Sequence, residues 1–597
     1  MRQGFAVSDP HPAVAAATPQ QVGPIYFAVI FGWTMSAVSA TMCAVVRWPL
    51  GSPHWFVFAK AFLLLAGVIS CAATLVVWRV ERRGGSYATV LVATLPVLFL
   101  PCLVWPLGWA ADGVAYPVLL GLLAVGARPA VAAVRSVPRR QPIFAVVCGC
   151  LAGFGYFLLI NSKGYATVLT PELALVGTQH LDTLFHASIA NMLVKHGALS
   201  TGLDGLVPIK YHVLSHIWLG CLSLWLGVTT LEGYYIGAQV VAIPMLFFSL
   251  AFATHLLRRP GEGLADSALT TLVPLLLLFV ADLFGWTSYL VSESYFLAMI
   301  LFLLALPLLA EMADDQRRFR FDMQIVALFV VGILILVAKI SVGVIFWAAA
   351  GFLLWRKAGL TILNLVKLAP PILLLVWFGA SISSPDAGTY VHALRPLSFI
   401  REFPKGAWPN VLANLVLLYG AWLVWRSGSL RDKRCAEVFA IVAIGSLVPA
   451  LLFEIGGGSA YYFANVGTWA CIVFVSAYGV TILEKRSPGL MKPGFVLAAI
   501  LLLALATGEK RHSVGKLAAQ FGDLQARARV LIGKPPGEPT TTWQRIVALL
   551  APDHPARLAL AADVKLTPGA RAKQTLLSMG LMQDSGAAVF VPPDNLA

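Results

Sequence analysis

Residues 56–78 read FVFAKAFLLLAGVISCAATLVVW, and Arg79, Arg82 and Arg83 follow shortly after. This run holds one charged side chain, Lys60, and has the length of about 20 residues that a transmembrane helix needs. The whole chain of 597 residues is similar, with 59% hydrophobic and only 12% charged residues, whereas soluble domains have about 25% charged residues. The composition excludes a soluble enzyme and a disordered chain, and it indicates a multi-pass α-helical membrane protein.

Fifteen apolar runs of this kind predict about 15 transmembrane helices. They cover residues 25–46, 56–78, 88–108, 114–134, 143–161, 232–257, 267–285, 290–310, 323–338, 341–355, 361–380, 408–425, 436–455, 463–483 and 493–507. Clusters of arginine and lysine lie in alternate loops, and the opposite loops carry few basic residues. Because basic loops stay in the cytoplasm, the asymmetry predicts an inner or plasma membrane protein with its N-terminus inside and its tail outside.

This topology divides the chain into five parts. They are a cytoplasmic segment at 1–24, N-terminal transmembrane helices at 25–161, an outward loop at 162–231, C-terminal transmembrane helices at 232–507 and an outward tail at 508–597. The tail contains two helical patterns, 513–532 and 541–551, and a strand-like run at 587–591. It therefore predicts a small α/β cap over the membrane part.

One apolar segment does not fit a simple count of spans. Residues 211–228, YHVLSHIWLGCLSLWLGV, are apolar enough to cross the bilayer. If they crossed it, Arg258 and Arg259 would face outward and every later basic cluster would invert. We therefore expect 211–228 to lie at the outer interface as an amphipathic or re-entrant helix. The short runs 323–338 and 341–355 are expected to cross obliquely or to re-enter.

Cysteine placement and net charge point to no further chemistry. All eight cysteines except Cys435 lie in or beside apolar runs, and no pair flanks a polar loop. We expect them to be small packing residues rather than disulfides or zinc ligands. The net charge of +15 comes mostly from short clusters between apolar runs, so it does not indicate nucleic-acid binding.

The first outward loop gathers ionisable side chains capable of acid–base chemistry. Apolar residues recur at helical spacing from Leu181 to Leu193, and Gly197 stands where a helix often ends. This pattern predicts a helix lying in the interface over 181–197. The ionisable residues of the loop include Glu172, His180, Asp182, His186, His212 and His216.

These residues have structural interpretations as well as chemical ones. Asp182, at the start of a helix, is the place for a helix cap or a dipole partner. His186 and His212 each suit interfacial packing with one hydrogen bond. His212 and His216, four residues apart, share a helix face and would suit zinc, whereas Asp182 with water and phosphate would suit Mg²⁺ or Mn²⁺.

A second outward segment, 381–407, supplies positive charge. It contains His392, Arg395, Arg401 and Lys405, and Lys339 lies at the outer end of the run 323–338. Arginine suits bidentate contact with a phosphate. The same residues would also bind lipid headgroups non-specifically.

The first outward loop resembles the GT-C superfamily of integral-membrane glycosyltransferases. The resemblance rests on His180-Leu181-Asp182, on Phe185-His186 with Ile189-Ala190, Leu193 and Gly197, on Tyr211-His212 opening a second helix, and on a span ending at Arg258-Arg259. It covers about 160–260. The chain departs from the family pattern in two ways, because its acidic loop follows the fifth span instead of the first, and Asp182 stands alone where many members carry paired carboxylates.

The resemblance implies a membrane glycosyltransferase. Such an enzyme moves a sugar from a polyprenyl-phosphate donor to a glycan, lipid or protein acceptor at the outer face. It implies that Asp182 is the base for the acceptor hydroxyl, oriented by His180 and His186, and that His212 and the basic residues of 381–407 with Lys339 bind the phosphate. Any metal, Mg²⁺ or Mn²⁺, would use Asp182 with His212 and His216.

Two other functions fit the same sequence. A transporter or lipid flippase would bury ionisable residues in mid-span, and no convincing chain of such residues is apparent. An O-antigen polymerase or ligase would place its arginines and histidine in a late outward loop, and 381–407 fits that description. Mutation of 180–216 or of 392–405 would separate the glycosyltransferase from this alternative.

Overall fold

The computed structural model describes most of the membrane part of the chain. The described residues are 23–47, 55–81, 86–136, 140–161, 181–201, 208–258, 292–314, 322–358, 369, 372–373, 376–377, 393–455 and 460–479. The predicted tail 508–597, the runs 267–285 and 493–507, and most of the run 361–380 and of the segment 1–24 lie outside them.

Almost every described element is a helix. The helices are α1 (Gly23–Arg47), α2 (Trp55–Glu81), α3 (Tyr87–Leu98), α4 (Leu100–Val104), the 3₁₀ turn η3 (Trp105–Ala110), α5 (Ala111–Ser136), α6 (Arg140–Asn161), α7 (Leu181–His196), α8 (Leu214–Leu226), α9 (Thr230–Ile236), the π-helical turn η6 (Gly237–Ala242), α10 (Ile243–Leu257), α12 (Glu293–Asp314), α13 (Met323–Ala338), α14 (Ile340–Ala358), α16 (Ser398–Glu402), α17 (Pro404–Ser427), α18 (Leu430–Leu452), α19 (Ala460–Phe474) and the π-helical turn η9 (Val475–Gly479).

The helices form an apolar bundle suited to a membrane. Within the described residues, nine helices are long and apolar enough to cross a bilayer, and four shorter apolar helices accompany them. In a bilayer every backbone polar group must find its partner inside the protein, and a helix meets this need. The prediction of an all-α multi-pass membrane protein is confirmed.

The run 88–108 does not form one helix. The chain leaves α3 after Leu98, makes the short helix α4 and turns through η3 before α5 begins. Pro96, Pro101 and Pro106 each lack a backbone N–H. Gly108, in η3, has φ +55° and ψ −121°, which a side chain would disfavour. The periodicity of the run therefore did not reveal where the helix breaks.

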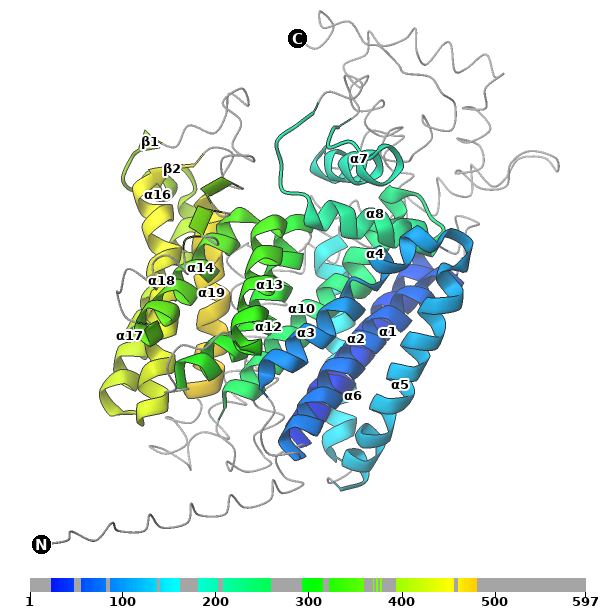
Figure 1. The fold of residues 1–597 in the computed structure, drawn as a ribbon, viewed down its shortest axis with the longest axis horizontal. Coiled ribbons are helices and arrows are strands. Elements are labelled where there is room, and N and C mark those ends of the chain that lie inside the picture. The colour runs from blue at the N-terminus through cyan, green and yellow to red at the C-terminus, as the bar shows by residue number, and fades with distance from the viewer. Residues whose placement is uncertain are drawn as a thin grey trace, which may run out of the picture.

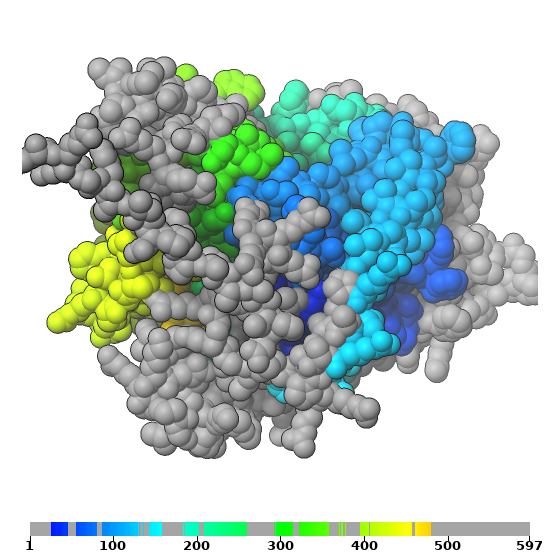
Figure 2. Space-filling model, turned by 60° about the horizontal axis from the view of Figure 1, so that its bottom comes forward, coloured from blue at the N-terminus to red at the C-terminus, as the bar shows by residue number. Residues whose placement is uncertain are grey.

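Ion pairs join helix ends at one end of the bundle. Arg79, in the last turn of α2, lies 2.9 Å from Glu311 near the end of α12. Arg356, in the last turn of α14, pairs with Glu437 near the start of α18. Several clusters that the sequence assigns to the cytoplasm therefore meet at one end. Figure 2, which brings the bottom of the molecule forward, shows the blue N-terminal helices and the yellow C-terminal pair on opposite sides.

Two helices lie across the opposite end of the bundle. Figure 1 shows α7 above α8, with both running across the direction of the long helices below them. At the same end, β1 (Ala393–Leu394) pairs with β2 (Phe453–Glu454) as an antiparallel two-stranded sheet, which the sequence did not predict. The positions of α7 and α8 are important because they carry the residues singled out above.

Helix α7 begins and ends as predicted but is more deeply buried. Gly197 follows it with φ +62°, and its N–H donates to the carbonyl of Leu193. The sequence predicted one apolar face, yet the side chains from His186 to Met192 are all buried. Packing against both α8 and α9 accounts for part of this burial.

Candidate functional site

Helices α7 and α8 cross in close contact. A Cβ at Gly220 of α8 would overlap the side chain of Val194 and the carbonyl of Ala190, both on α7. Only a residue without a side chain permits this approach. The crossing brings histidines of the two helices together, although they are far from adjacent in sequence.

A hydrogen bond between two buried imidazoles joins α7 to α8. His186 Nδ1 lies 2.9 Å from His216 Nε2, and both rings are buried. One of these nitrogens donates and the other accepts, so the pair shares one proton. The ring centroid of Tyr211 lies 5.7 Å from that of His186 and 5.6 Å from that of His216. The sequence indicated His186 and His216 as separate candidates, and the structure shows that they are hydrogen-bonded to each other.

His212 lies beside this pair but precedes the helix. Helix α8 begins at Leu214, so the prediction that it opens with Tyr211-His212 is wrong. Residues 208–213 are non-helical, because this segment bonds to another helix: the Val213 N–H donates to the carbonyl of Val337 at the end of α13. His212 and His216 therefore do not share a helix face, although their ring centroids are 6.2 Å apart.

Lys339 reaches the same place from the end of α13. It is buried, and its Nζ lies 4.0 Å from the ring centroid of Tyr462. Burial, and next the nearby Lys339 cation, hold the pKa of His212 well below 6.5, and His216 and His186 lower that pKa further. His212 is therefore a neutral imidazole next to a cation. We call His186, His212, His216 and Lys339 the outer polar cluster.

A polar network continues from Lys339 into the bundle. The Tyr462 hydroxyl lies 3.3 Å from the hydroxyl of Ser292, just before α12. Its ring lies 5.2 Å from that of Tyr295, whose hydroxyl donates to Asn465 on α19. The Asn465 side chain in turn donates to the amide oxygen of Asn410 on α17. Buried polar side chains in membrane helices are costly, so such a network indicates a structural or functional need.

Several buried polar atoms near this end have no hydrogen-bond partner in the described part of the chain. They are His212 Nε2 and the hydroxyls of Thr183, Ser215, Ser294 and Ser341. Each hydroxyl stands second or third in its helix, namely α7, α8, α12 and α14. The first N–H groups of a helix also lack partners within the helix, and that end attracts anions. Two of these helix starts follow residues of the outer polar cluster, since α8 begins after His212 and α14 after Lys339. A third, α12, begins after Ser292, which contacts the Tyr462 ring system beside Lys339.

The described residues offer no ready metal site. No group of three or more histidine, cysteine, aspartate or glutamate side chains in the described ranges is arranged to hold an ion. The buried cation Lys339 also opposes a second cation beside His212. The metal site of Asp182, His212 and His216 stays a prediction, because the structure does not describe the side chain of Asp182.

The remaining predicted residues fall into two groups. Asp182 is the second residue of α7, and Lys405 the second of α17, but neither side chain is described, and His180 and His392 lie outside the described residues. Arg395 and Arg401 are exposed. Arg395 Nη1 lies 3.0 Å from Glu454 Oε2, because the β1–β2 pair brings these residues together. The Glu454 carboxylate raises the pKa of Arg395. The sequence did not predict this ion pair.

Sequence reasoning missed the tyrosines that frame the cluster. Tyr462 was not among the candidate site residues, and Tyr211 was named only as the start of a helix. The aromatic pair Tyr461-Tyr462, with Asn465 one turn later in an apolar run, was the available signal. A polar amide inside a predicted span indicates a buried partner.

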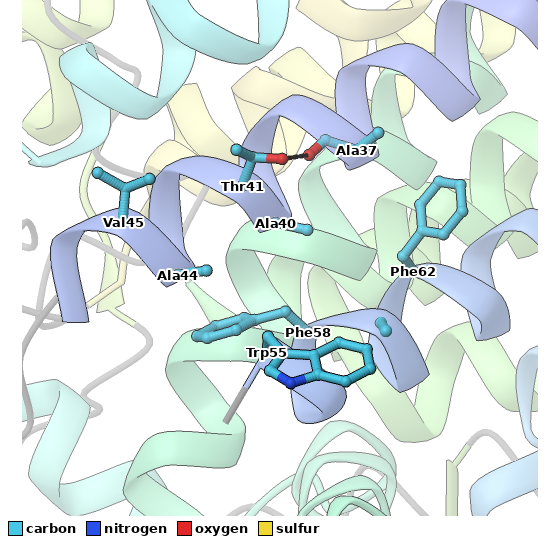
Figure 3. A pocket seen from close by; sticks show the side chains of 9 residues that line it. Ala37, Ala40, Thr41, Ala44, Val45, Trp55, Phe58 and Phe62 are labelled. Atoms are coloured by element: carbon cyan, nitrogen blue, oxygen red, sulfur yellow. Dashed lines mark hydrogen bonds between the residues drawn. The ribbon is translucent and has the colours of Figure 1, made fainter. Parts of the chain in front are cut away.

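An apolar groove between α1 and α2 stands apart from the cluster. It has a volume of about 500 Å³ and is lined by alanines of α1 and by Trp55, Phe58 and Phe62 of α2. Figure 3 shows these side chains facing the groove, with the Thr41 hydroxyl donating to the Ala37 carbonyl. This hydroxyl is therefore already bonded, and the groove offers surface rather than chemistry.

Acid should destabilise the protein through His212. In the unfolded chain His212 takes up a proton near pH 6.5, but in the folded chain its lowered pKa keeps it neutral. The unfolded state then binds more protons below pH 6.5, so the free energy of unfolding should fall with pH by up to about 1.4 kcal/mol per pH unit. The loss should level off below the folded pKa.

Thermal unfolding in detergent between pH 7.5 and 5 measures this effect. His212→Gln should weaken the pH dependence, and His196→Gln, at an exposed position of α7, should leave it unchanged. Equal pH dependence in the wild type and His212→Gln would contradict the assignment.

The chain was also compared with known proteins. No protein family, no characterised protein and no solved structure matches it. Functional inference therefore rests on the residues themselves.

Proposed function

We propose that the protein is a membrane glycosyltransferase that moves a sugar from a polyprenyl-phosphate donor to an acceptor at the outer face. The observation that carries the proposal is the outer polar cluster itself. It joins α7, which bears Asp182, to the buried cation Lys339 at one end of an apolar bundle. A lipid-linked phosphosugar presents its phosphate at this kind of boundary.

The phosphate would lie at Lys339 and His212. Lys339 supplies positive charge, and a neutral His212 can donate one hydrogen bond through Nε2. The unpartnered hydroxyls of Ser215, Ser294 and Ser341 supply further donors. Three helix starts add their favourable field for an anion. These groups suit an anion better than a neutral ligand.

The proposed transfer uses Asp182 as the base. The acceptor hydroxyl attacks C1 of the sugar, and Asp182 takes its proton. The bond from C1 to the phosphate oxygen breaks, and the electron pair leaves with the polyprenyl phosphate. Lys339 stabilises the charge that develops on this leaving group. The His186–His216 bond holds α7 and α8 in register, so that the base and the cation keep their separation.

The cluster would lie at membrane depth on the outer face. Helices α7 and α8 lie across the bundle, opposite to the end where Arg79 and Arg356 are found. By the positive-inside rule the arginine end is cytoplasmic. Both crossing helices are then interfacial helices at the outer surface, and 211–228 does not span.

Release of polyprenyl phosphate tests the proposed function. The purified protein in nanodiscs is incubated with a panel of short-chain polyprenyl-monophosphate sugars and membrane-extracted acceptors, and free lipid phosphate is measured by mass spectrometry. Transfer predicts release that Asp182→Asn slows by about 10²–10⁴-fold. Movement of a fluorescent polyprenyl lipid between leaflets, without any release, would favour the flippase alternative.

The orientation can be tested with two cysteine variants. Lys195→Cys lies at the exposed end of α7, and Ser427→Cys at the exposed end of α17, next to the basic residue Arg426. A membrane-impermeant maleimide added to intact cells should label the first above the background of the parent chain. It should label the second only after the membrane is permeabilised. The reverse pattern would invert the topology and remove the cluster from the outer face.

A further inference from the structure

The far end of α8 is held by a buried lysine of α2. Lys60 Nζ lies 2.7 Å from the carbonyl oxygen of Trp225, the second-last residue of α8. It also lies 2.9 and 3.2 Å from the two carboxylate oxygens of Asp112, in the first turn of α5. An ammonium has three N–H donors, so these acceptors satisfy it fully.

The surroundings make this contact a strong one. Lys60 is 6% exposed, and the aromatic rings of Trp225, Tyr116 and Phe56 lie 4.9, 5.5 and 5.9 Å from its Nζ. The last carbonyls of a helix lack partners within the helix and carry its negative end, which favours a cation there. Lys60, a residue of α2, therefore caps the C-terminus of α8.

Helix α8 links this contact to the outer polar cluster. From His212 to Trp225 the chain rises about 20 Å along a mostly helical path. In mid-helix, Trp218 Nε1 donates to the carbonyl of Leu98 at the end of α3. Two hydrogen bonds therefore join α8 to the N-terminal helices, from Trp218 to Leu98 and from Lys60 to the Trp225 carbonyl, whereas His216, near the start of α8, bonds to His186 of α7. A short rigid helix transmits a shift at one end to the other.

We propose that the Lys60–Asp112 pair is a remote positioning device for the outer polar cluster. It holds the C-terminus of α8, and α8 in turn holds His212 and His216 against Lys339 and His186. Lys60 is thus a positioning residue, and the N-terminal helices α2 to α5 support the site instead of only filling the membrane. What the cluster does chemically rests on the proposed function, but its position does not.

Histidine reactivity tests the proposal without any substrate. The full-length protein in nanodiscs is treated with diethyl pyrocarbonate, which modifies accessible neutral imidazoles, and each histidine is followed by mass spectrometry. In the wild type, buried His212 and His216 should react slowly and exposed His196 quickly. Because a buried group reacts through local opening, Lys60→Met should speed modification of His212 and His216 by about tenfold, with His196 unchanged. Asp112→Asn should raise it less, because the amide still accepts one hydrogen bond.

The matched control is Arg79→Met. It breaks the ion pair at the other end of the same helix, where Arg79 meets Glu311. This variant should leave His212 and His216 as slow as in the wild type. The proposal is overturned if Lys60→Met and Asp112→Asn both leave the two histidines slow, or if Arg79→Met accelerates them equally. Should Lys60→Met fail to accumulate, Asp112→Asn decides alone.

The same variants separate this proposal from the proposed function. If Lys60→Met exposes the histidines but no polyprenyl-monophosphate sugar is cleaved by any form of the protein, the positioning role stands and the glycosyltransferase does not. If cleavage occurs and neither Lys60→Met nor Asp112→Asn changes the reactivity of the histidines or the rate, the glycosyltransferase stands and the positioning role does not.

Discussion

Asp182→Asn should lower the rate of sugar transfer by about 10²–10⁴-fold, the usual contribution of a general base. Asp182 is the second residue of α7, the helix that His186 joins to the outer polar cluster. Asparagine keeps the shape and most hydrogen bonding of aspartate but cannot accept the acceptor's proton. It also caps a helix as well as aspartate does, so loss of a cap would not explain a large effect. The initial rate of polyprenyl phosphate release measures the change.

A second aspartate at the opposite end of the bundle provides the control. Asp322 caps α13, with its Oδ1 accepting from the backbone N–H groups of Gln324 and Ile325. Asp322→Asn should leave the rate within about twofold of the wild type, since asparagine retains the cap. Nearly full activity in Asp182→Asn would make that residue structural. The base would then be sought among the other carboxylates that the predicted topology places outside in this half of the chain, which are Glu172, Asp204 and Glu293.

Lys339→Met should weaken donor use by about 10- to 100-fold, the loss expected for a hydrogen bond to a charged group. Methionine keeps much of the apolar stem against Tyr462 but removes the charge. The effect should appear in kcat/KM for the polyprenyl-phosphate sugar, because both donor binding and leaving-group stabilisation would suffer. Steady-state kinetics at varied donor concentration measure it.

Two matched variants make this result specific. Lys210→Met removes an exposed lysine from the non-helical segment before α8, two residues before His212. Arg395→Gln removes the arginine that already pairs with Glu454. Each should change kcat/KM by less than about threefold, as expected for exposed charges. A larger loss in Arg395→Gln than in Lys339→Met would move the phosphate to the second outward segment and favour the polymerase or ligase alternative.

The membrane fold was largely predictable because its cause is local. A bilayer requires long apolar runs, and such runs are visible in the sequence without any knowledge of their neighbours. The runs 25–46, 56–78 and 323–338 match α1, α2 and α13 closely. The break near Leu98 was missed, because the chain turns there through prolines and Gly108 inside a run that is apolar throughout.

The candidate site was predictable only as a set of residues. The loop 162–231 was chosen because it concentrates histidines and acids, and His186, His212 and His216 of that loop are neighbours in the structure. Lys339 was expected to act with both His212 and Arg395, and in the structure it lies near His212. Arg395 has Glu454 as its partner, 59 residues later in the chain.

The sequence by itself determined that the chain is a helical membrane protein, where many of its helices begin and end, and which loop is rich in acid–base groups. These properties depend on hydropathy, charge and local backbone preferences, which each segment carries alone. Only the tertiary structure decided that His186 bonds to His216, that Lys339 lies beside His212 and that Lys60 closes α8. Lys60 and Trp225 are 165 residues apart. Such contacts depend on how helices pack, and apolar helix surfaces of similar composition do not encode that packing in any one segment.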